Sequence, residues 1–161
     1  MKLENRKRKS YEYIMKLEAL PQEIFPLLCP VREYDWIPGW QCTLLYSKSG
    51  FAELGCVFKT DYDERFGDEI WVVSEYVPDT KITFVRTGNL RTTRYEITLK
   101  TEETLTTLNW MQEITALNNE GDKAVLGYDE NEYKTMMESL YQMLNHYLKT
   151  GSALVPDSSK S

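Results

Sequence analysis

The sequence contains little of what nucleophilic, redox or metal chemistry usually requires. It has one histidine and three cysteines among 161 residues. No two cysteines have the CxxC spacing of zinc and redox sites. Three thiols, an odd number, suit a reducing compartment. We therefore expect a cytoplasmic protein that holds no metal and no cofactor.

Long apolar runs are also missing. The longest uncharged apolar run, Ile24 to Val31, contains two prolines and is far too short to span a bilayer. The segment Ser10 to Lys16, which follows the basic start, is too polar for the core of a signal peptide. The sequence therefore predicts neither a membrane span nor a targeting segment.

Positive charge is scarce outside the first ten residues. The formal net charge is −6, yet residues 1–10 contain five cations against the single acid Glu4. An acidic body argues against binding of nucleic acid, which depends on neutralising phosphates with Lys and Arg. The basic start has the chemistry to touch a nucleic acid or an anionic membrane, but a solvated entrance to the first strand is favoured.

The segment from Asp129 to Lys149 separates its apolar from its polar residues completely. At about 100° per residue, the apolar side chains of a helix here fall within an arc of roughly 160°. The only histidine, His146, falls outside the arc, so a surface role is favoured over a catalytic one. The helix must therefore lie against a large apolar surface. The apolar side chains are Tyr133, Met136, Met137, Leu140, Tyr141, Met143, Leu144, Tyr147 and Leu148.

Alternating apolar and polar residues predict a series of strands before this helix. The connections between them are short, and such connections join antiparallel neighbours. Asn118 to Asp122 is expected to end the sheet. The expected strands are Tyr11 to Leu17, Trp40 to Ser47, Gly55 to Tyr62, Ile70 to Val77, Lys81 to Thr87, Arg91 to Lys100 and Thr104 to Leu117, with short helices at Pro21 to Phe25 and Glu33 to Ile37.

This order of elements predicts one α+β domain over residues 11–150. Residues 1–10 are expected to form a basic lead, and residues 151–161 a flexible tail. We find no internal repeat and no low-complexity linker between two domains.

Two segments carry a resemblance to a known superfamily. Leu17 to Phe25 resembles the strand-to-helix entry of START-like, birch-pollen-allergen-like proteins (SRPBCC, polyketide cyclase-type), and Trp71 to Phe84 resembles their central hairpin. Cys29 to Trp40 is similar to a signature of an uncharacterised bacterial branch. The resemblance implies a helix-grip fold: a curved seven-stranded antiparallel sheet wrapped around a long C-terminal helix, with two short helices between strands 1 and 2.

A ligand site is expected between that sheet and the final helix, because ligand sites are typically apolar with a few placed polar groups. Arg86 and Gln112 are the polar side chains expected on the inner face. A buried Arg86 needs a carboxylate such as Glu75, a water-filled mouth or an anionic ligand group. A filled core is the alternative. The candidate site residues are Trp40, Phe58, Trp71, Phe84, Arg86, Trp110, Gln112, Tyr133, Met136, Met137, Leu140 and Tyr141.

Three other clusters have less specific chemistry. Cys42 and Cys56 flank the first hairpin and are expected to be cross-strand neighbours, where buried thiols acting as small hydrophobes are favoured over a metal site. An acidic cluster resembles a calcium loop, but Phe66 stands where an EF-hand needs glycine, so a solvated turn is favoured. Tyr34, Trp36 and Trp40 form either a gate or a packing cluster. The acidic cluster is Asp61, Asp63, Glu64, Asp68 and Glu69.

The leading functional hypothesis is non-catalytic binding or carriage of a hydrophobic or amphipathic small molecule, such as a lipid, a polyketide or an aromatic metabolite. The resemblance also implies two alternatives. One is an enzyme of the cyclase or lyase kind that works without a metal. The other is a co-chaperone-like interaction module similar to activators of a heat-shock ATPase. One fold serves all three roles, so the site must decide among them.

Overall fold

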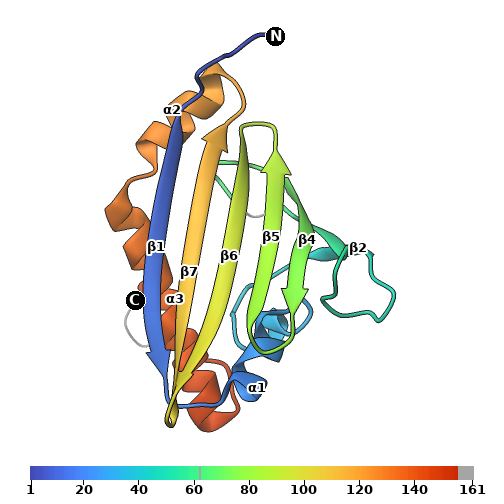
Figure 1. The fold of residues 1–161 in the computed structure, drawn as a ribbon, viewed down its shortest axis with the longest axis vertical. Helices are drawn as coiled ribbons and strands as arrows, with labels where there is room; N and C mark the ends of the chain where they lie inside the picture. The colour runs from blue at the N-terminus through green and yellow to red at the C-terminus, as the bar shows by residue number, and fades with distance from the viewer. Residues whose placement is uncertain (62, 156–161) are drawn as a thin grey trace.

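The computed structural model describes residues 1–61 and 63–155, and its framework is one antiparallel sheet of seven strands. The strands lie in the order β1-β7-β6-β5-β4-β3-β2, so β1 returns to pair with β7 (Figure 1). The sheet expected from the alternation is confirmed. The strands are β1 (Arg8–Leu17), β2 (Thr43–Tyr46), β3 (Val57–Thr60), β4 (Glu69–Val77), β5 (Lys81–Gly88), β6 (Arg91–Glu102) and β7 (Leu105–Ala116).

One long helix, α3 (Glu130–Thr150), lies against one face of this sheet (Figure 1). It begins where the Asp129 side chain accepts a hydrogen bond from the backbone N–H of Glu132 at 2.8 Å. It ends at Gly151, whose φ of 73° favours glycine. Between β1 and β2 lie the short helices α1 (Pro21–Ile24), η1 (Phe25–Leu28) and η2 (Glu33–Asp35).

The core fills most of the space between the sheet and α3. On β7, every second residue from Thr106 to Ala116 is buried, as expected for a strand with one covered face. On α3, Tyr133, Met137 and Leu144 are fully buried, which confirms that the apolar stripe faces the sheet. Met136 belongs to the same stripe but is 40% exposed.

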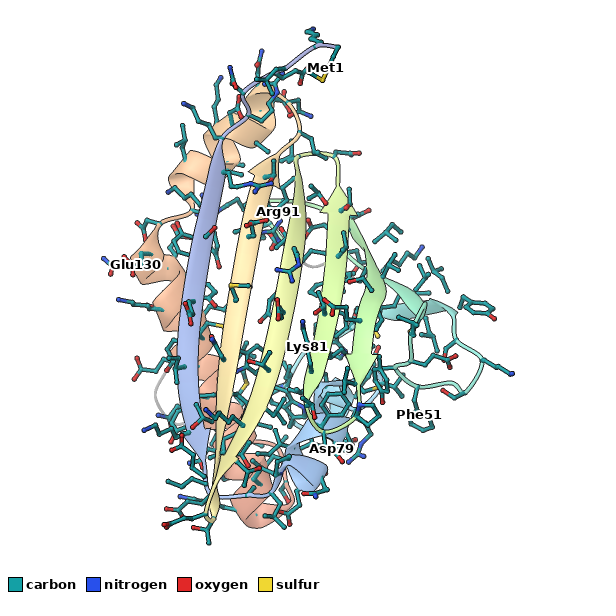
Figure 2. The ribbon with its side chains drawn as sticks, in the orientation of Figure 1. Met1, Phe51, Asp79, Lys81, Arg91 and Glu130 are labelled. Atoms are coloured by element: carbon teal, nitrogen blue, oxygen red, sulfur yellow. The ribbon has the colours of Figure 1, made fainter. Side chains whose placement is uncertain are left out.

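The first hairpin is shorter than the sequence predicts. β2 and β3 have four residues each, and the connection 47–56 projects from the sheet, with Phe51 at its outer side (Figure 2). The Glu53 carboxylate organises this loop because it accepts hydrogen bonds from the Ser47 and Ser49 hydroxyls and the Ser49 N–H. The expected strand end at Tyr62, and residues 156–161 of the expected tail, lie outside the described residues.

The sheet ends at Ala116, before Asn118 as expected, but the helix that follows, α2 (Asn119–Gly127), was not predicted. Asn118 starts the helix by accepting a hydrogen bond from the N–H of Gly121 at 2.8 Å. A Cβ atom at Gly121 would lie 2.0 Å from the carbonyl oxygen of Leu90. This glycine therefore permits close packing of α2 on the β5–β6 turn and does not mark a break in the chain.

Cations of the basic lead bind the α2 region. Arg6 pairs with Asp122 at 3.0 Å, and the Lys9 ammonium donates to the backbone carbonyls of Leu126 and Tyr128. This use of positive charge agrees with the favoured interpretation of the segment as a strand entrance. In the described part of the chain, no helix combines the length and apolar character needed to cross a membrane.

Candidate ligand-binding site

A cavity of about 270 Å³ lies between the inner face of the sheet, the η2–β2 segment and α3. We call it the aromatic cavity. Its lining is mostly aromatic and aliphatic, with Glu33, Arg86 and Gln112 as polar members. The lining residues are Pro30, Glu33, Trp36, Ile37, Pro38, Gly39, Trp40, Phe58, Trp71, Phe84, Arg86, Tyr95, Ile97, Trp110, Gln112, Met136 and Leu140.

The floor of the aromatic cavity is a continuous row of rings across five strands. Phe58 stacks on Trp71 with ring centroids 5.2 Å apart, and Trp71 meets Phe84 edge-on at 5.7 Å. Tyr95 continues the row towards Trp110 at 6.0 Å. The strand register produces this order, because directly opposed and diagonal residues on one face come within reach of aromatic side chains.

Arg86 is the charged member of this floor, and its carboxylate partner is Glu69. An Arg86 Nη2 atom lies 2.5 Å from the Glu69 carboxylate, and the guanidinium group lies 4.0 Å from the centroid of the Trp71 ring. Arg91 binds the same carboxylate with two hydrogen bonds of 2.9 and 3.0 Å. The prediction of a solvated Glu69 was therefore wrong, because its side chain has no exposed area.

Glu75, the carboxylate suggested for Arg86, does not bind it, because Arg86 lies opposite Trp71 whereas Glu75 lies opposite Thr83, four residues further along β4. Glu69, Trp71 and Val73 alternate onto the inner face, but the pairing of β4 with β5 shifts between Val73 and Glu75. This irregularity reverses the alternation. Glu75 pairs with Lys81 at 3.1 Å instead.

Glu33 is an acidic side chain in the lining of the aromatic cavity, and its charge interacts with that of Arg86. The residue is partly exposed, but its carboxyl group is withdrawn from water among the lining side chains, and this burial raises its pKa well above the usual range. The positive charge of Arg86 lowers the pKa by a smaller amount. A neutral Glu33 carboxyl group can donate a hydrogen bond as well as accept one.

Two side chains of the cavity floor have buried donors that lack acceptors. The Trp110 indole N–H and the Arg86 Nε–H form no hydrogen bond, although both residues are less than a tenth exposed. Such groups are rare in folded proteins and call for an explanation. By contrast, the Tyr95 hydroxyl interacts with Gln112, and burial raises the pKa of Tyr95 well above its usual value.

Nine of the twelve residues expected from the sequence line the aromatic cavity; Tyr133, Met137 and Tyr141 do not. Tyr133 and Met137 are fully buried in the packed core, and Tyr141 packs against that core from the helix. The Tyr133 hydroxyl donates to the carbonyl oxygen of Trp110 at 3.1 Å, and its ring stacks on Tyr11. Burial raises the pKa of Tyr133.

The η2–β2 segment contributes Trp40, which the sequence assigned to the site, and Trp36, which it did not. Trp36 is completely buried, and its indole N–H donates to the carbonyl oxygen of Leu27 at 2.8 Å. The indole N–H of Trp40 donates to the carbonyl oxygen of Pro30 at 2.8 Å. Both tryptophans are thus anchored under the loop and also line the cavity. Tyr34 points to the backbone of Cys42 and is half exposed.

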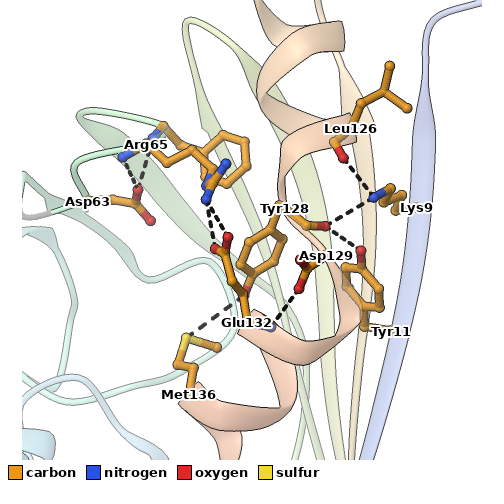
Figure 3. Close-up of polar contacts among 10 residues, drawn as sticks. Lys9, Tyr11, Asp63, Arg65, Leu126, Tyr128, Asp129, Glu132 and Met136 are labelled. Atoms are coloured by element: carbon orange, nitrogen blue, oxygen red, sulfur yellow. Dashed lines mark hydrogen bonds and ion pairs between the residues drawn. The ribbon is translucent and has the colours of Figure 1, made fainter.

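A second, more polar opening adjoins the aromatic cavity, and the two share Arg86, Gln112 and Met136. We call this opening, of about 760 Å³, the polar cleft. Its lining comes from Asp63 to Phe66, Arg91 and the start of α3. Arg65 reaches across it and donates two hydrogen bonds, of 2.8 and 2.7 Å, to Glu132 of α3 (Figure 3).

Neither the histidine nor the cysteines belong to this site. His146 is partly buried on α3 and lines neither the aromatic cavity nor the polar cleft. The register, which pairs Thr43 with Lys59 and Tyr46 with Val57, places Cys42 and Cys56 at opposite ends of the hairpin, so they are not cross-strand neighbours. Among residues 1–61 and 63–155, no three metal-binding side chains are grouped to hold an ion.

Comparison with known proteins depends on structure rather than sequence. No family model matches the sequence, and no curated protein matches it. DynU16, a protein in the dynemicin biosynthetic locus, is similar with a TM-score of 0.63 and 16% identity, over 89% of this chain and 48% of that one. The chain thus spans about half the length of DynU16.

Two further structures match over nearly their whole length. The Aha1 dimer from Colwellia psychrerythraea has a TM-score of 0.61 and 15% identity, over 89% of this chain and 98% of that one. Ara h 8.0201 has a TM-score of 0.61 and 12% identity, over 89% and 99%. The chain has the helix-grip fold.

The fold is therefore the one that the sequence resemblance implied. Identities this low establish the fold alone, and the same fold serves unrelated activities. The function of this helix-grip domain must therefore be argued from the aromatic cavity and the polar groups in it.

Proposed function

We propose that this helix-grip protein binds an apolar or amphipathic small molecule in the aromatic cavity. The observation that carries the proposal is open space of about 270 Å³ enclosed by tryptophan, phenylalanine and tyrosine rings. Protein interiors are normally packed without voids of this size. An apolar cavity with a few polar side chains is the usual form of a small-molecule site.

The place of Met136 supports entry of a ligand from the solvent. Met136 is 40% exposed and lines both the aromatic cavity and the polar cleft. Its flexible thioether accepts a single long hydrogen bond, of 4.0 Å, from the Tyr128 hydroxyl (Figure 3), so the side chain can move at little cost. The aromatic lining of the cavity suits a ligand with a flat apolar surface. Binding of such a ligand requires no catalytic step.

A role in protein interaction is the second candidate, and the projecting loop 47–56 favours it. Phe51 and Leu54 on this loop are 53% and 66% exposed. One structural neighbour, Aha1, was determined as a dimer. Exposed apolar patches are common at protein contacts. This role does not account for the open cavity, which is why ligand binding ranks first.

A fluorescence titration with N-phenyl-1-naphthylamine, an uncharged aromatic probe, tests the proposal. Wild-type protein is expected to bind the probe with enhanced emission. Met136→Trp places a large ring at the shared opening and should weaken binding by about tenfold or more, equivalent to ~1.4 kcal/mol. Ser139→Trp, at an exposed position of the same helix that lines neither opening, should bind like wild type.

Absence of probe binding to the folded wild-type protein would refute ligand binding in this cavity. Equal affinities for Met136→Trp and wild type would place the probe elsewhere on the molecule. Circular dichroism of each variant checks that the fold is intact.

A further inference from the structure

Two arginines and one glutamate are buried together beside the aromatic cavity. Arg86, Arg91 and Glu69 are 7%, 3% and 1% exposed. The Glu69 carboxylate is within 2.5 to 3.0 Å of both guanidinium groups. These three side chains together carry one positive charge in excess, and an uncompensated buried charge is costly.

With Asp63 also beside Arg91, Arg86 is the less fully paired of the two arginines. Arg91 donates two hydrogen bonds to the Glu69 carboxylate, and the Asp63 carboxylate lies 3.8 Å from the same guanidinium group. Within the described chain, the only ion pair of Arg86 is the Nη2 contact with Glu69, and its Nε–H has no acceptor. A guanidinium group has five N–H donors, so Arg86 keeps donors for another partner.

The cavity itself does not supply the missing anion. Glu33 lines the same cavity, but burial favours its neutral, protonated form. Gln112 is uncharged and interacts with Tyr95. The Trp110 N–H is a further donor without an acceptor. The cavity thus has buried donors without acceptors, at Arg86 and at Trp110, on its floor.

We propose that the aromatic cavity selects organic carboxylates, with the carboxylate of the ligand on Arg86 and a flat apolar body against the aromatic rings. A carboxylate suits Arg86 because it is planar and matches the fork of a guanidinium group. The ring of Trp71 already holds one face of the guanidinium group, which leaves its edge for the ligand. This inference rests on the proposed function and adds the chemical class of the ligand.

A pair of probes of equal size and different charge tests the inference. Wild-type protein should bind 2-naphthoate at least about tenfold more tightly than the neutral 2-naphthamide, because hydrogen bonds between charged groups are the strongest in proteins. Arg86→Gln should bring this ratio close to one. The variant keeps a matched buried pair, since Arg91 still binds Glu69 with two hydrogen bonds. Arg94→Gln, at an exposed position outside the cavity, should keep the wild-type ratio.

Equal affinity of wild type for the two naphthyl probes would overturn the inference, as would a carboxylate preference that survives in folded Arg86→Gln. If that variant does not fold, the acid-to-amide ratio of the wild type decides alone. Binding of N-phenyl-1-naphthylamine without a carboxylate preference refutes only the inference. Failure of the wild type to bind any of the three probes refutes the proposed function as well.

Discussion

At the scale of single residues, the buried carboxylate of Glu69 is the main support of the charged groups beside the cavity. It neutralises one of two buried guanidinium groups, and the rings of Trp71 and Phe66 cover Arg86 and Arg91 at 4.0 and 3.6 Å. Burial lowers the pKa of Arg91, and the hydrogen bonds that it donates to Glu69 act against that change. Removal of this carboxylate would leave two positive charges without a buried partner.

Glu69→Gln should therefore destabilise the protein by about 3–5 kcal/mol. Denaturant unfolding measures the change. Glu113→Gln removes an exposed carboxylate, 3.2 Å from Arg8 on the outer face, and should cost less than about 1 kcal/mol. Similar losses for the two variants would show that the buried cluster does not stabilise the fold.

Glu33 gives a pH dependence of the opposite kind to that of a salt-bridged acid. Burial raises the pKa of its carboxyl group in the folded state, so folding favours the protonated form. The stabilising contribution is therefore fully present at pH values below about 4.5, the pKa of this carboxyl group in the unfolded chain. It is lost as the pH rises from there through the raised pKa of the folded state. Arg86, Tyr95 and Cys42 are the charged or titratable groups that interact electrostatically with it.

Glu33→Gln should remove this loss of folding stability at higher pH, because glutamine does not ionise. We expect the variant to be more stable than wild type at neutral pH by about 1 kcal/mol or more, since a tenfold change in a protonation equilibrium corresponds to about 1.4 kcal/mol. Thermal unfolding between pH 4 and pH 9 measures the difference, with Glu18→Gln at an exposed position as the control. A stability difference that does not grow with pH would contradict a raised pKa of Glu33.

At the scale of elements, α2 depends on close contact with the β5–β6 turn. A methyl group at Gly121 would collide with the backbone of Leu90, which cannot move aside like a side chain. Gly121→Ala should therefore destabilise the protein by about 1–3 kcal/mol. Gly127→Ala in the same helix meets only the end of the Arg65 side chain at 3.0 Å. That control should be neutral or stabilising by up to about 1 kcal/mol.

The same elements show what the sequence can and cannot predict. The stripe on α3 and the alternation of β6 and β7 depend on local periodicity, and both were correctly predicted. Helix α2 was missed because the polar segment from Asn118 to Asp122 was assigned only as the end of the sheet, although its Gly121 allows close contact with Leu90. The pairing of β4 with β5 could not be read from the alternation, and it places Glu69 rather than Glu75 beside Arg86.

The candidate site could be predicted only in part, because only some of its residues belong to periodic strands and helices. Side chains on strands could be assigned to the inner face, so Trp71, Phe84 and Trp110 were placed correctly on the sheet. Glu33 and Trp36 come from an irregular segment, whose side-chain directions follow no period. On α3, the stripe gave the buried face but did not separate the cavity wall from the packed core around Tyr133.

At the scale of the whole molecule, the sheet, the η2–β2 segment and α3 enclose one apolar space that opens beside Arg86 into the polar cleft. The central claim is that an apolar guest occupies this space. The methyl NMR signals of isoleucine residues can show where such a guest binds. Ile37 and Ile97 line the aromatic cavity, whereas Ile14 and Ile70 are 57% and 43% exposed and line neither opening.

Methyl NMR of isoleucine-labelled protein during titration with N-phenyl-1-naphthylamine is the most direct measurement of that claim. The account predicts large, saturable shifts of the Ile37 and Ile97 methyl signals, with those of Ile14 and Ile70 unchanged. Shifts centred on Ile14 or Ile70, or no saturable shift at any isoleucine, would contradict it.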